Sequence, residues 1–437
     1  MTKKALSQRI SLLVVFCLFI TACADFFKSD KSAAPSPDNN PTSTPQKPSG
    51  TLPPEFADPN AGAFTEKKML INIGTQVLAK ATESLTQQVP ALKNSLDRYC
   101  TALQNGGNAD REASLAKADW ERVMLAYHEI EAAPFGPLLE QNRFLIDNLY
   151  SWPYLNTCAI DKKVVENLQT PVNVSSLIFN MRGLGAVEYL LFEGSLKSSC
   201  NPRANPEMAQ WNNRESALKK TDRCLFARAL AQDIEDKARL LHSRWAVEQG
   251  NFTLSLVNGS LYSDEKKALN ALTDALAHIE VLKDAKLGRP LGRHKDCTED
   301  KCPRDVEHIY SGLSLASAEA QLKGFKAIFT GSYQSHSTAF GIDDLLIKAG
   351  REDVANNVVA ALNKALASLQ TAQVQGSLQE QADLMDSSLC KSTSMTDRKE
   401  EICAVHADVR EVAFLLKTQV LAALALRAPP THQGDND

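Results

Sequence analysis

The chain has 437 residues, of which 43% are apolar, 6% are aromatic and 23% are charged. This length allows about two to three domains, and the apolar content excludes a chain that is disordered throughout. The formal net charge of −4 gives no sign of a nucleic-acid-binding protein. Phosphate-loop and dinucleotide-binding motifs are absent from the sequence, so nucleotide binding has no support either.

The first residues have the features of a bacterial export signal. Three basic residues within the first nine precede an apolar run at residues 10–20, which is too short for a membrane-spanning helix. The Ile-Thr-Ala-Cys that follows resembles the lipobox of bacterial lipoproteins. That resemblance implies cleavage after residue 22 and lipidation of Cys23, whereas ordinary signal cleavage would leave Cys23 unmodified.

Residues 23–60 form a predicted linker. Eight of the 19 prolines fall between residues 29 and 59, among Ser, Asn, Asp and Lys residues that cannot bury an apolar face. We therefore expect a disordered tether, which holds the protein off a membrane to which acyl chains on Cys23 attach it. Ala24, rather than Asp, follows the cysteine, which favours the outer membrane in the usual description of lipoprotein sorting. The expected location is the cell envelope, facing the periplasm.

Beyond residue 60 the sequence predicts helices almost throughout, because apolar residues recur three and four positions apart. Long helices with short breaks predict antiparallel neighbours, so the expected fold is all-α, with two up-and-down helical bundles. A division near residues 250–262 gives an N-terminal bundle over 61–255, a C-terminal bundle over 256–428 and a disordered tail over 429–437. The expected helices span residues 64–103, 110–132, 140–150, 172–193, 215–249, 263–285, 306–329, 341–347, 351–388 and 398–427.

Eight cysteines remain after the export segment and Cys23 are set aside, and an exported protein is expected to pair them as disulfides. Sequential pairing is favoured, because the last three pairs would each close a local loop between predicted helices. A zinc site at Cys297 and Cys302, flanked by His294 and His308, is the alternative for one pair. The eight candidates are Cys100, Cys158, Cys200, Cys224, Cys297, Cys302, Cys390 and Cys403.

Two glutamates interrupt otherwise apolar helical stripes. On one predicted helix Trp120, Met124 and Tyr127 follow the i, i+4, i+7 spacing, and the next member is Glu131. A carboxylate on such a stripe is costly unless it is paired, hydrogen-bonded or bound to a metal ion. His128 lies three residues before Glu131, so both side chains can line one side of the helix, although a surface position for this histidine is the alternative.

The second glutamate is Glu188, which continues a stripe formed by Leu177, Met181 and Leu184. Helical bundles build metal sites from inward carboxylates and nearby histidines, so Glu131 and Glu188 are candidate metal ligands. The alternative is that each glutamate pairs with an arginine or accepts a loop amide. The available arginines are Arg122, Arg143 and Arg182.

The chain also carries an ordered series of short blocks. They are Trp120 and residues 131–137, 146–153, 182–192, 290–292, 307–311, 323–325 and 341–346. In this order they resemble the imelysin family over about residues 64–425. The resemblance implies an all-helical envelope lipoprotein or secreted protein with two bundles. Some members of the family are named as insulin-cleaving metallopeptidases, and others belong to iron-uptake systems.

The sequence departs from the family signature Gly-x-His-x-x-Glu, because Gly185 stands where the resemblance implies a metal-binding histidine. Glycine offers no ligand atom, and only the glutamate of the signature, Glu188, is retained. His128 with Glu131 could supply a substitute imidazole from a facing helix. Trp152 and Arg182 are candidates for residues that contact and orient the metal ligands without binding the ion themselves.

Three functions compete at this point. The first is a non-catalytic envelope lipoprotein that binds a metal ion, with iron favoured, in a carboxylate-lined cleft in connection with iron uptake, together with an envelope transport or receptor protein. The second is a metal-free scaffold that kept the fold and lost the site. The third is a metallopeptidase, which is disfavoured because the signature histidine is absent and no His-Glu-x-x-His motif occurs.

Overall fold

The computed structural model describes residues 53–334, 338–390 and 401–429, which form helices and turns without a strand. All of the described residues belong to one compact unit. The predicted export signal, the lipidation of Cys23, the tether up to residue 52 and nearly all of the tail fall outside the described residues. Residues 53–60, the end of the predicted tether, are described; they contain the turn η1 Pro54–Phe56, and Phe56 is buried. The all-α prediction is confirmed. None of the described helices combines the length and the apolarity that crossing a bilayer requires.

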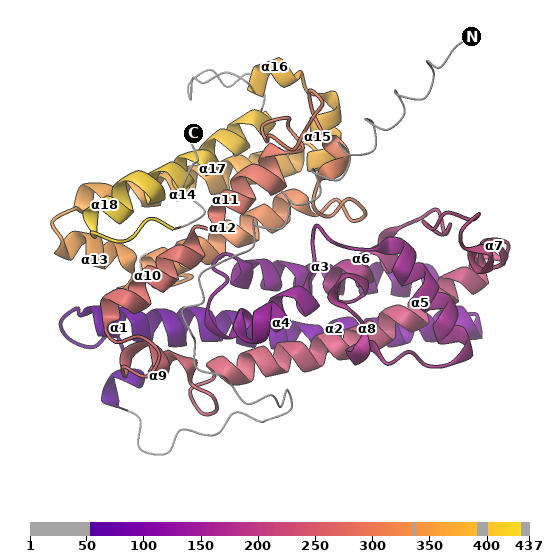
Figure 1. The fold of residues 1–437 in the computed structure, drawn as a ribbon, viewed down its shortest axis with the longest axis horizontal. Helices are drawn as coiled ribbons and strands as arrows, with labels where there is room; N and C mark the ends of the chain where they lie inside the picture. Colours follow the sequence, from indigo (N-terminus) through magenta and orange to yellow (C-terminus); the bar gives the residue numbers. More distant parts are fainter. Residues whose placement is uncertain (1–52, 335–337, 391–400, 430–437) are drawn as a thin grey trace, which may run out of the picture. The chain divides into compact units, whose positions relative to one another are not determined.

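The first bundle consists of long helices from the N-terminal half of the chain (Figure 1). Helix α2 packs against both α3 and α8, and α6 lies against α3 and α8. Apolar side chains of these helices, such as Leu92, Trp120 and Ile234, are fully buried between them. The bounds are α1 Glu66–Asn72, a π-helical stretch η2 Ile73–Leu78, α2 Ala79–Asn105, α3 Ala109–Glu131, α6 Gly183–Phe192 and α8 Ser216–Trp245.

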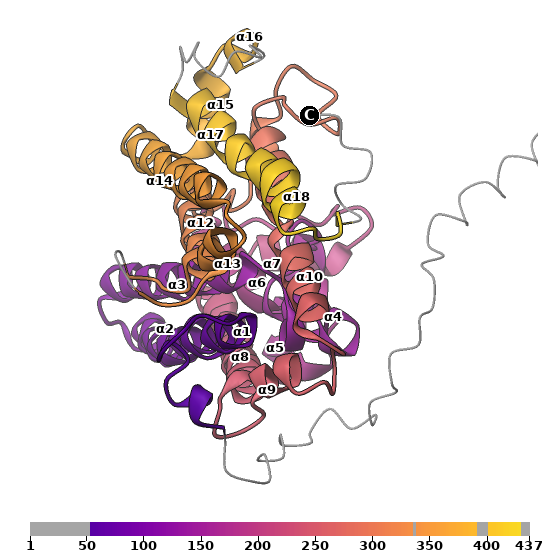
Figure 2. The same cartoon turned by 90° about the vertical axis from the view of Figure 1, so that its left-hand side faces the viewer.

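The second bundle comes from the C-terminal half, and α12 is its central helix. Figure 2 shows α12 between α14 on one side and α3 of the first bundle on the other, in agreement with the contacts of these helices. Helix α17 packs on α14 and on the π-helical stretch η6. The bounds are α10 Glu265–Leu276, α11 Ile279–Val281, η6 Leu282–Gly288, α12 Ser314–Thr330, α13 Ile342–Lys348, α14 Glu352–Val374 and α17 Glu401–Leu415.

Shorter helices connect and cover the two bundles. Helices α5, α7 and α9 lie in stretches where the sequence predicted no helix, and α7 and α9 are too short to show a clear period. The shorter helices are α4 Glu140–Leu149, α5 Thr157–Gln169, α7 Pro206–Asn212, α9 Phe252–Val257, α15 Leu378–Leu384, α16 Ser387–Cys390, a π-helical stretch η8 Leu416–Val420 and α18 Leu421–Ala423. Single 3₁₀ turns are η1 Pro54–Phe56, η3 Gly136–Leu138, η4 Val174–Ser176, η5 Phe179–Met181 and η7 Pro303–Asp305.

The two bundles touch where α3 crosses α12. A Cβ atom on Gly324 of α12 would lie 2.1 Å from the backbone oxygen of Glu129 in α3, so only glycine allows the helices to approach this closely. Trp120, Tyr127 and His128 of α3 are all fully buried. The close crossing therefore brings α3, with its buried histidine, next to the start of the second bundle.

Two helices begin later than the sequence predicted. The helix expected from residue 172 begins at Gly183, and residues 172–182 contain only the turns η4 and η5. Gly183 has φ +76°, and a Cβ there would lie 2.5 Å from the Leu149 oxygen, so the chain changes direction at this residue. Leu177 and Met181 thus do not share a helix with Glu188, and that part of the predicted stripe is wrong.

The helix expected from residue 306 begins at Ser314 instead. His308 has φ +58° and Gly312 has φ +74°, and these left-handed conformations interrupt any helix over residues 306–313. The segment before α12 is therefore a loop, and His308 is held within it.

Four disulfides join the eight cysteines. The bonds Cys297–Cys302 and Cys390–Cys403 follow the predicted sequential pairing. Because Cys297 and Cys302 are joined in a disulfide, neither offers a free thiolate for the alternative zinc site. The other two predicted pairs are wrong, because the bonds are Cys100–Cys224 and Cys158–Cys200. Packing of α2 against α8 brings Cys100 beside Cys224, which is 124 residues away in the sequence. Pairing cysteines in sequence order cannot predict a partner at this distance.

Candidate metal centre

Two buried imidazoles face each other at the centre of the protein. His128 comes from α3, and His308 comes from the loop before α12. Their Nε2 atoms lie 2.9 Å apart, although 180 residues separate them in sequence. His128 is 0% exposed and His308 is 3% exposed, so their Nε2 atoms are shielded from bulk water.

A glutamate holds each imidazole by its other nitrogen. The Nδ1 atom of His128 lies 2.7 Å from Oε2 of Glu131, and Nδ1 of His308 lies 3.0 Å from Oε2 of Glu188. The other carboxylate oxygen of Glu188, Oε1, accepts hydrogen bonds from the backbone amide (3.1 Å) and the hydroxyl (2.9 Å) of Ser311. A carboxylate behind each histidine fixes the ring orientation and the tautomer, as in protein metal sites.

Glu307 and Lys286 complete the buried cluster. Ligand atoms of His128, Glu307 and His308 all lie within 4.8 Å of one another. The Nζ atom of Lys286 lies 2.6 Å from Oε2 of Glu131 and 3.0 Å from Oε1 of Glu307. Glu307 is 1% exposed and Lys286 is 3% exposed, so these charges compensate one another inside the protein.

The charges of the cluster shift the pKa values of its members. Burial lowers the pKa of His128, whereas at His308 the facing Glu188 carboxylate outweighs burial and raises the pKa. Burial opposes ionisation of Glu131 as well, but Lys286 and His128 hold the pKa of this carboxyl well below its usual range. The two pKa shifts have opposite directions, so His308 accepts a proton more readily than His128 does.

Aromatic rings enclose the two histidines. The Tyr150 ring stacks on His308 with centroids 5.6 Å apart, and the edge of Trp120 meets His308 at 5.7 Å. The Trp120 Nε1 atom donates to the Leu184 oxygen at 3.0 Å, which ties α3 to α6 beside the cluster. The hydroxyl of Tyr127 is buried and has no hydrogen-bond partner among the described residues.

The sequence of the chain matches the profile of the imelysin family over residues 77–412. The chain belongs to the imelysin family. No curated protein matches this imelysin closely enough to be informative.

Two solved structures resemble this imelysin in fold. One is an imelysin-like protein from Psychrobacter arcticum 273-4, with 16% identity and a TM-score of 0.59; the match covers 83% of this chain and 96% of that one. The other is described as an iron-regulated protein A precursor from Parabacteroides distasonis ATCC 8503, with 16% identity and a TM-score of 0.60. The match covers 87% of this chain and 98% of that one. At this identity the likeness shows the fold alone.

The candidate residues from the sequence lie at different distances from the cluster of this imelysin. Glu131 and Glu188 are both in it, but each contacts a histidine rather than the other glutamate. The Trp152 ring lies 5.9 Å from Lys286 Nζ, at the edge of the cluster. Arg182 instead pairs with Asp233 of α8, and its guanidinium also donates to loop carbonyls.

Gly185 occupies the family's histidine position without leaving a strained gap. A Cβ atom there would lie 3.5 Å from Tyr150 and from Leu155, at ordinary contact distance. Tyr150 is the ring that stacks on His308. The imidazole that faces Glu188 in this imelysin therefore comes from the loop before α12.

Sequence reasoning missed three members of the cluster: Lys286, Glu307 and His308. His308 was considered only as a flank of the zinc alternative. The block at residues 307–311 was noted in the family resemblance, and it contains both Glu307 and His308. Nothing in the local pattern marks Lys286, which lies one residue beyond the helix expected over 263–285 and falls in the π-helical stretch η6.

Proposed function

We propose that this imelysin binds one divalent cation, with ferrous iron the best fit, through Nε2 of His128, Nε2 of His308 and the Glu307 carboxylate. The observation that carries the proposal is the pair of Nε2 atoms 2.9 Å apart, each on a ring whose Nδ1 faces a glutamate. When both Nδ1 atoms donate their protons to these carboxylates, both Nε2 atoms present lone pairs to each other. Such a pair needs a positive centre between its members, which is either a proton or a metal ion.

The donor types support a metal ion. The ring centroids of the two histidines lie 5.2 Å apart, so their Nε2 atoms meet head-on at hydrogen-bond spacing, and an ion about 2.0–2.1 Å from each nitrogen requires the rings to turn or move apart. Two imidazoles and one carboxylate are the protein ligands that non-haem ferrous iron takes in many sites, and zinc accepts the same donors. In this proposal Glu131 and Glu188 orient the histidines rather than bind the ion.

The charge of the cluster also favours a divalent cation. Three carboxylates, one ammonium and one shared proton leave one net negative charge among the fully buried groups. A divalent ion in place of the shared proton brings this total to zero. Because a buried net charge is costly, the exchange relieves an electrostatic penalty that the protonated cluster retains.

The proposed role is metal handling in the cell envelope, in connection with iron uptake. The Parabacteroides protein that shares the fold is described as iron-regulated, and the export and lipobox pattern supports anchoring through Cys23. The ligand residues are at most 3% exposed, which suits holding an ion more than admitting a peptide chain for hydrolysis. An envelope transport or receptor protein is the proposed partner.

A specific observation favours a second candidate, a metal-free scaffold. The Lys286 ammonium lies within ion-pair distance of Glu131 and Glu307. This internal cation already neutralises part of the carboxylate charge that a metal ion would neutralise. Elemental analysis of protein purified from its native envelope separates the candidates. About one equivalent of iron or another metal per chain supports binding, and its absence supports the scaffold.

Calorimetric titration with Fe²⁺ under argon and with Co²⁺ tests the metal proposal directly. We expect one ion per chain, and at least a tenfold loss of affinity in His128→Gln and in His308→Gln, since each loses one nitrogen ligand. The matched control is His242→Gln, because His242 contacts Thr82 and lies outside the cluster. Equal affinities in all four proteins, or no uptake by the natural chain, would contradict the proposal.

A further inference from the structure

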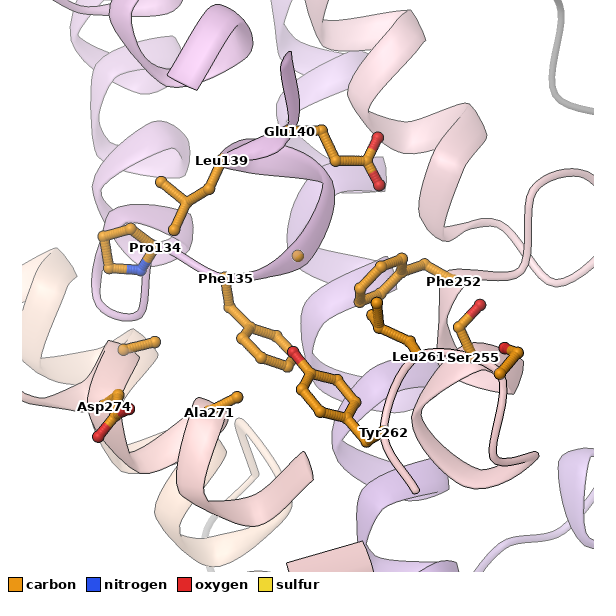
Figure 3. A pocket seen from close by; sticks show the side chains of 13 residues that line it. Pro134, Phe135, Leu139, Glu140, Phe252, Ser255, Leu261, Tyr262, Ala271 and Asp274 are labelled. Carbon is orange, nitrogen blue, oxygen red and sulfur yellow. The ribbon is translucent and has the colours of Figure 1, made fainter. Parts of the chain in front are cut away.

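A partly open cavity of about 700 Å³ lies beside the segment that follows Glu131 (Figure 3). Its walls come from the loop at residues 134–140, from α9 and the loop after it, and from α10. Aromatic side chains Phe135, Phe252 and Tyr262 form much of its surface. Its charged lining residues are Glu140 and Asp274, and the lining contains no lysine, arginine or histidine.

Asp274 presents an unsatisfied oxygen at the edge of this cavity. Its Oδ1 atom is buried and has no hydrogen-bond partner among the described residues. The other oxygen, Oδ2, pairs with the exposed guanidinium of Arg427. A buried carboxylate oxygen without a donor is costly, which makes it a ready ligand for a passing cation.

His278 lies four residues beyond Asp274, in the turn between α10 and α11, on the side of Glu131. Its Nε2 atom is also buried and also lacks a hydrogen-bond partner among the described residues. That atom is 3.9 Å from Oε1 of Glu131, while 22% of the His278 side chain remains exposed. Because α10 ends at Leu276, His278 lies in the turn that follows it, and Asp274 and His278 can contact one ion in succession as neighbours along the chain.

The cavity and the buried cluster are thus joined by two short segments. Glu131 belongs to the cluster, and Pro134 and Phe135, three and four residues later, line the cavity. On the opposite side Asp274 and Ala275 line the cavity, and His278 faces Glu131. Each segment therefore connects the cavity, within about four residues, to Glu131 or to the histidine that faces it.

We infer that Asp274 and His278 form a relay for divalent cations between this cavity and the cluster of His128, Glu307 and His308. The inference rests on the proposed function, because the relay needs a destination. A carboxylate followed by an imidazole offers the same donor types that the final site uses, so an ion can exchange water for protein ligands in steps. The relay is occupied only in transit, and it therefore changes the rates of binding and release by the same factor.

Stopped-flow mixing of the full chain with Co²⁺, followed by the visible absorption of the bound ion, tests the relay. The variant is the double substitution Asp274→Asn and His278→Gln, with each single substitution alongside. We expect at least tenfold slower association in the double variant, and an affinity within about twofold of the natural chain. The matched control is Glu140→Gln, which removes the other cavity carboxylate at the far edge from α10 and should leave the rate unchanged (Figure 3).

The outcomes separate the relay from the metal site itself. Normal affinity with an unchanged association rate in the double variant would overturn the relay and leave the metal site standing. A tenfold loss of affinity at an unchanged rate would overturn it too, since it would make these residues part of the final site. An equal slowing by Glu140→Gln would attribute the effect to general cavity charge. No Co²⁺ uptake by the natural chain would remove the proposed function and the relay together.

Discussion

Glu188 contacts a histidine from another part of the chain than the family signature implies. In the family signature a histidine precedes this glutamate by one helical turn, and Gly185 stands there in this chain. The structure places His308 3.0 Å from Glu188 instead. His308 reaches this position with φ +58°, a conformation that costs a non-glycine residue about 1–3 kcal/mol and that the surrounding contacts must maintain.

Asp343, near the start of α13, should make stability depend on pH. Burial, and then the neighbouring Asp344 charge, raise the pKa of this carboxyl to about 7. Between about pH 3.8 and 7 the folded protein therefore keeps a proton on Asp343 that the unfolded chain has released. The stability that this bound proton contributes is lost as the pH rises toward 7. We expect Asp343→Asn to raise the melting temperature by about 2–5 °C at pH 7–8, with the gain shrinking toward pH 4.

Thermal melts of both proteins between pH 4 and 8 check this sign. Asn keeps the oxygen that accepts the Asp344 amide, so the change removes only the charge. Asp353 is the matched control, because its pKa is lowered by Arg351 and Asp353→Asn should bring no gain as pH rises. A constant difference across the range for Asp343→Asn would show that this carboxyl does not titrate as described.

At the scale of the element, periodicity predicted the long helices well. The helix expected over residues 110–132 is Ala109–Glu131, and the one expected over 215–249 is Ser216–Trp245. Long helices repeat their apolar spacing many times, so the signal survives a few exceptions. Residues 172–182 and 306–313 also carry apolar residues at helical spacing, but left-handed residues next to them redirect the chain, and a periodicity argument does not contain that information.

Two neighbouring glycines at the start of α6 should respond in opposite ways to a methyl group. Gly183→Ala would force an alanine into φ +76° against the Leu149 oxygen, and we expect it to cost at least about 2 kcal/mol of unfolding free energy. Gly185→Ala meets only ordinary contacts inside a helix, and we expect a gain of about 0.5–1 kcal/mol. Chemical denaturation measures both. A loss of stability in Gly185→Ala would show that this position has no room for a side chain.

At the scale of the whole molecule, sequence reasoning predicted two bundles but not which distant residues meet. Glu131, Glu188 and His128 were singled out from stripes and from the family signature. Their meeting with His308 spans 180 residues and depends on how α3 crosses α12, which no local pattern encodes. The same limit explains why Cys100 was assigned to the wrong partner.

The disulfides should differ in how much they stabilise the fold. Cys100–Cys224 links positions 124 residues apart, and Cys297–Cys302 links positions 5 apart. Loop-closure entropy predicts a stabilisation of about 4–5 kcal/mol for the first and about 2 kcal/mol for the second. We expect the double alanine variant at Cys100 and Cys224 to unfold at clearly lower denaturant concentration than the one at Cys297 and Cys302. Equal midpoints would argue that chain entropy does not dominate here.

The two facing imidazoles come from opposite halves of the chain, and this has a consequence for release. An ion bound by His128 and His308 opposes the separation of α3 from the loop before α12. By reciprocity, a partial separation of these two segments lowers the affinity for the ion by the same factor. Cargo could then be discharged by a small mechanical displacement, such as one imposed by a docking receptor. Acidification of the surrounding compartment would not be needed.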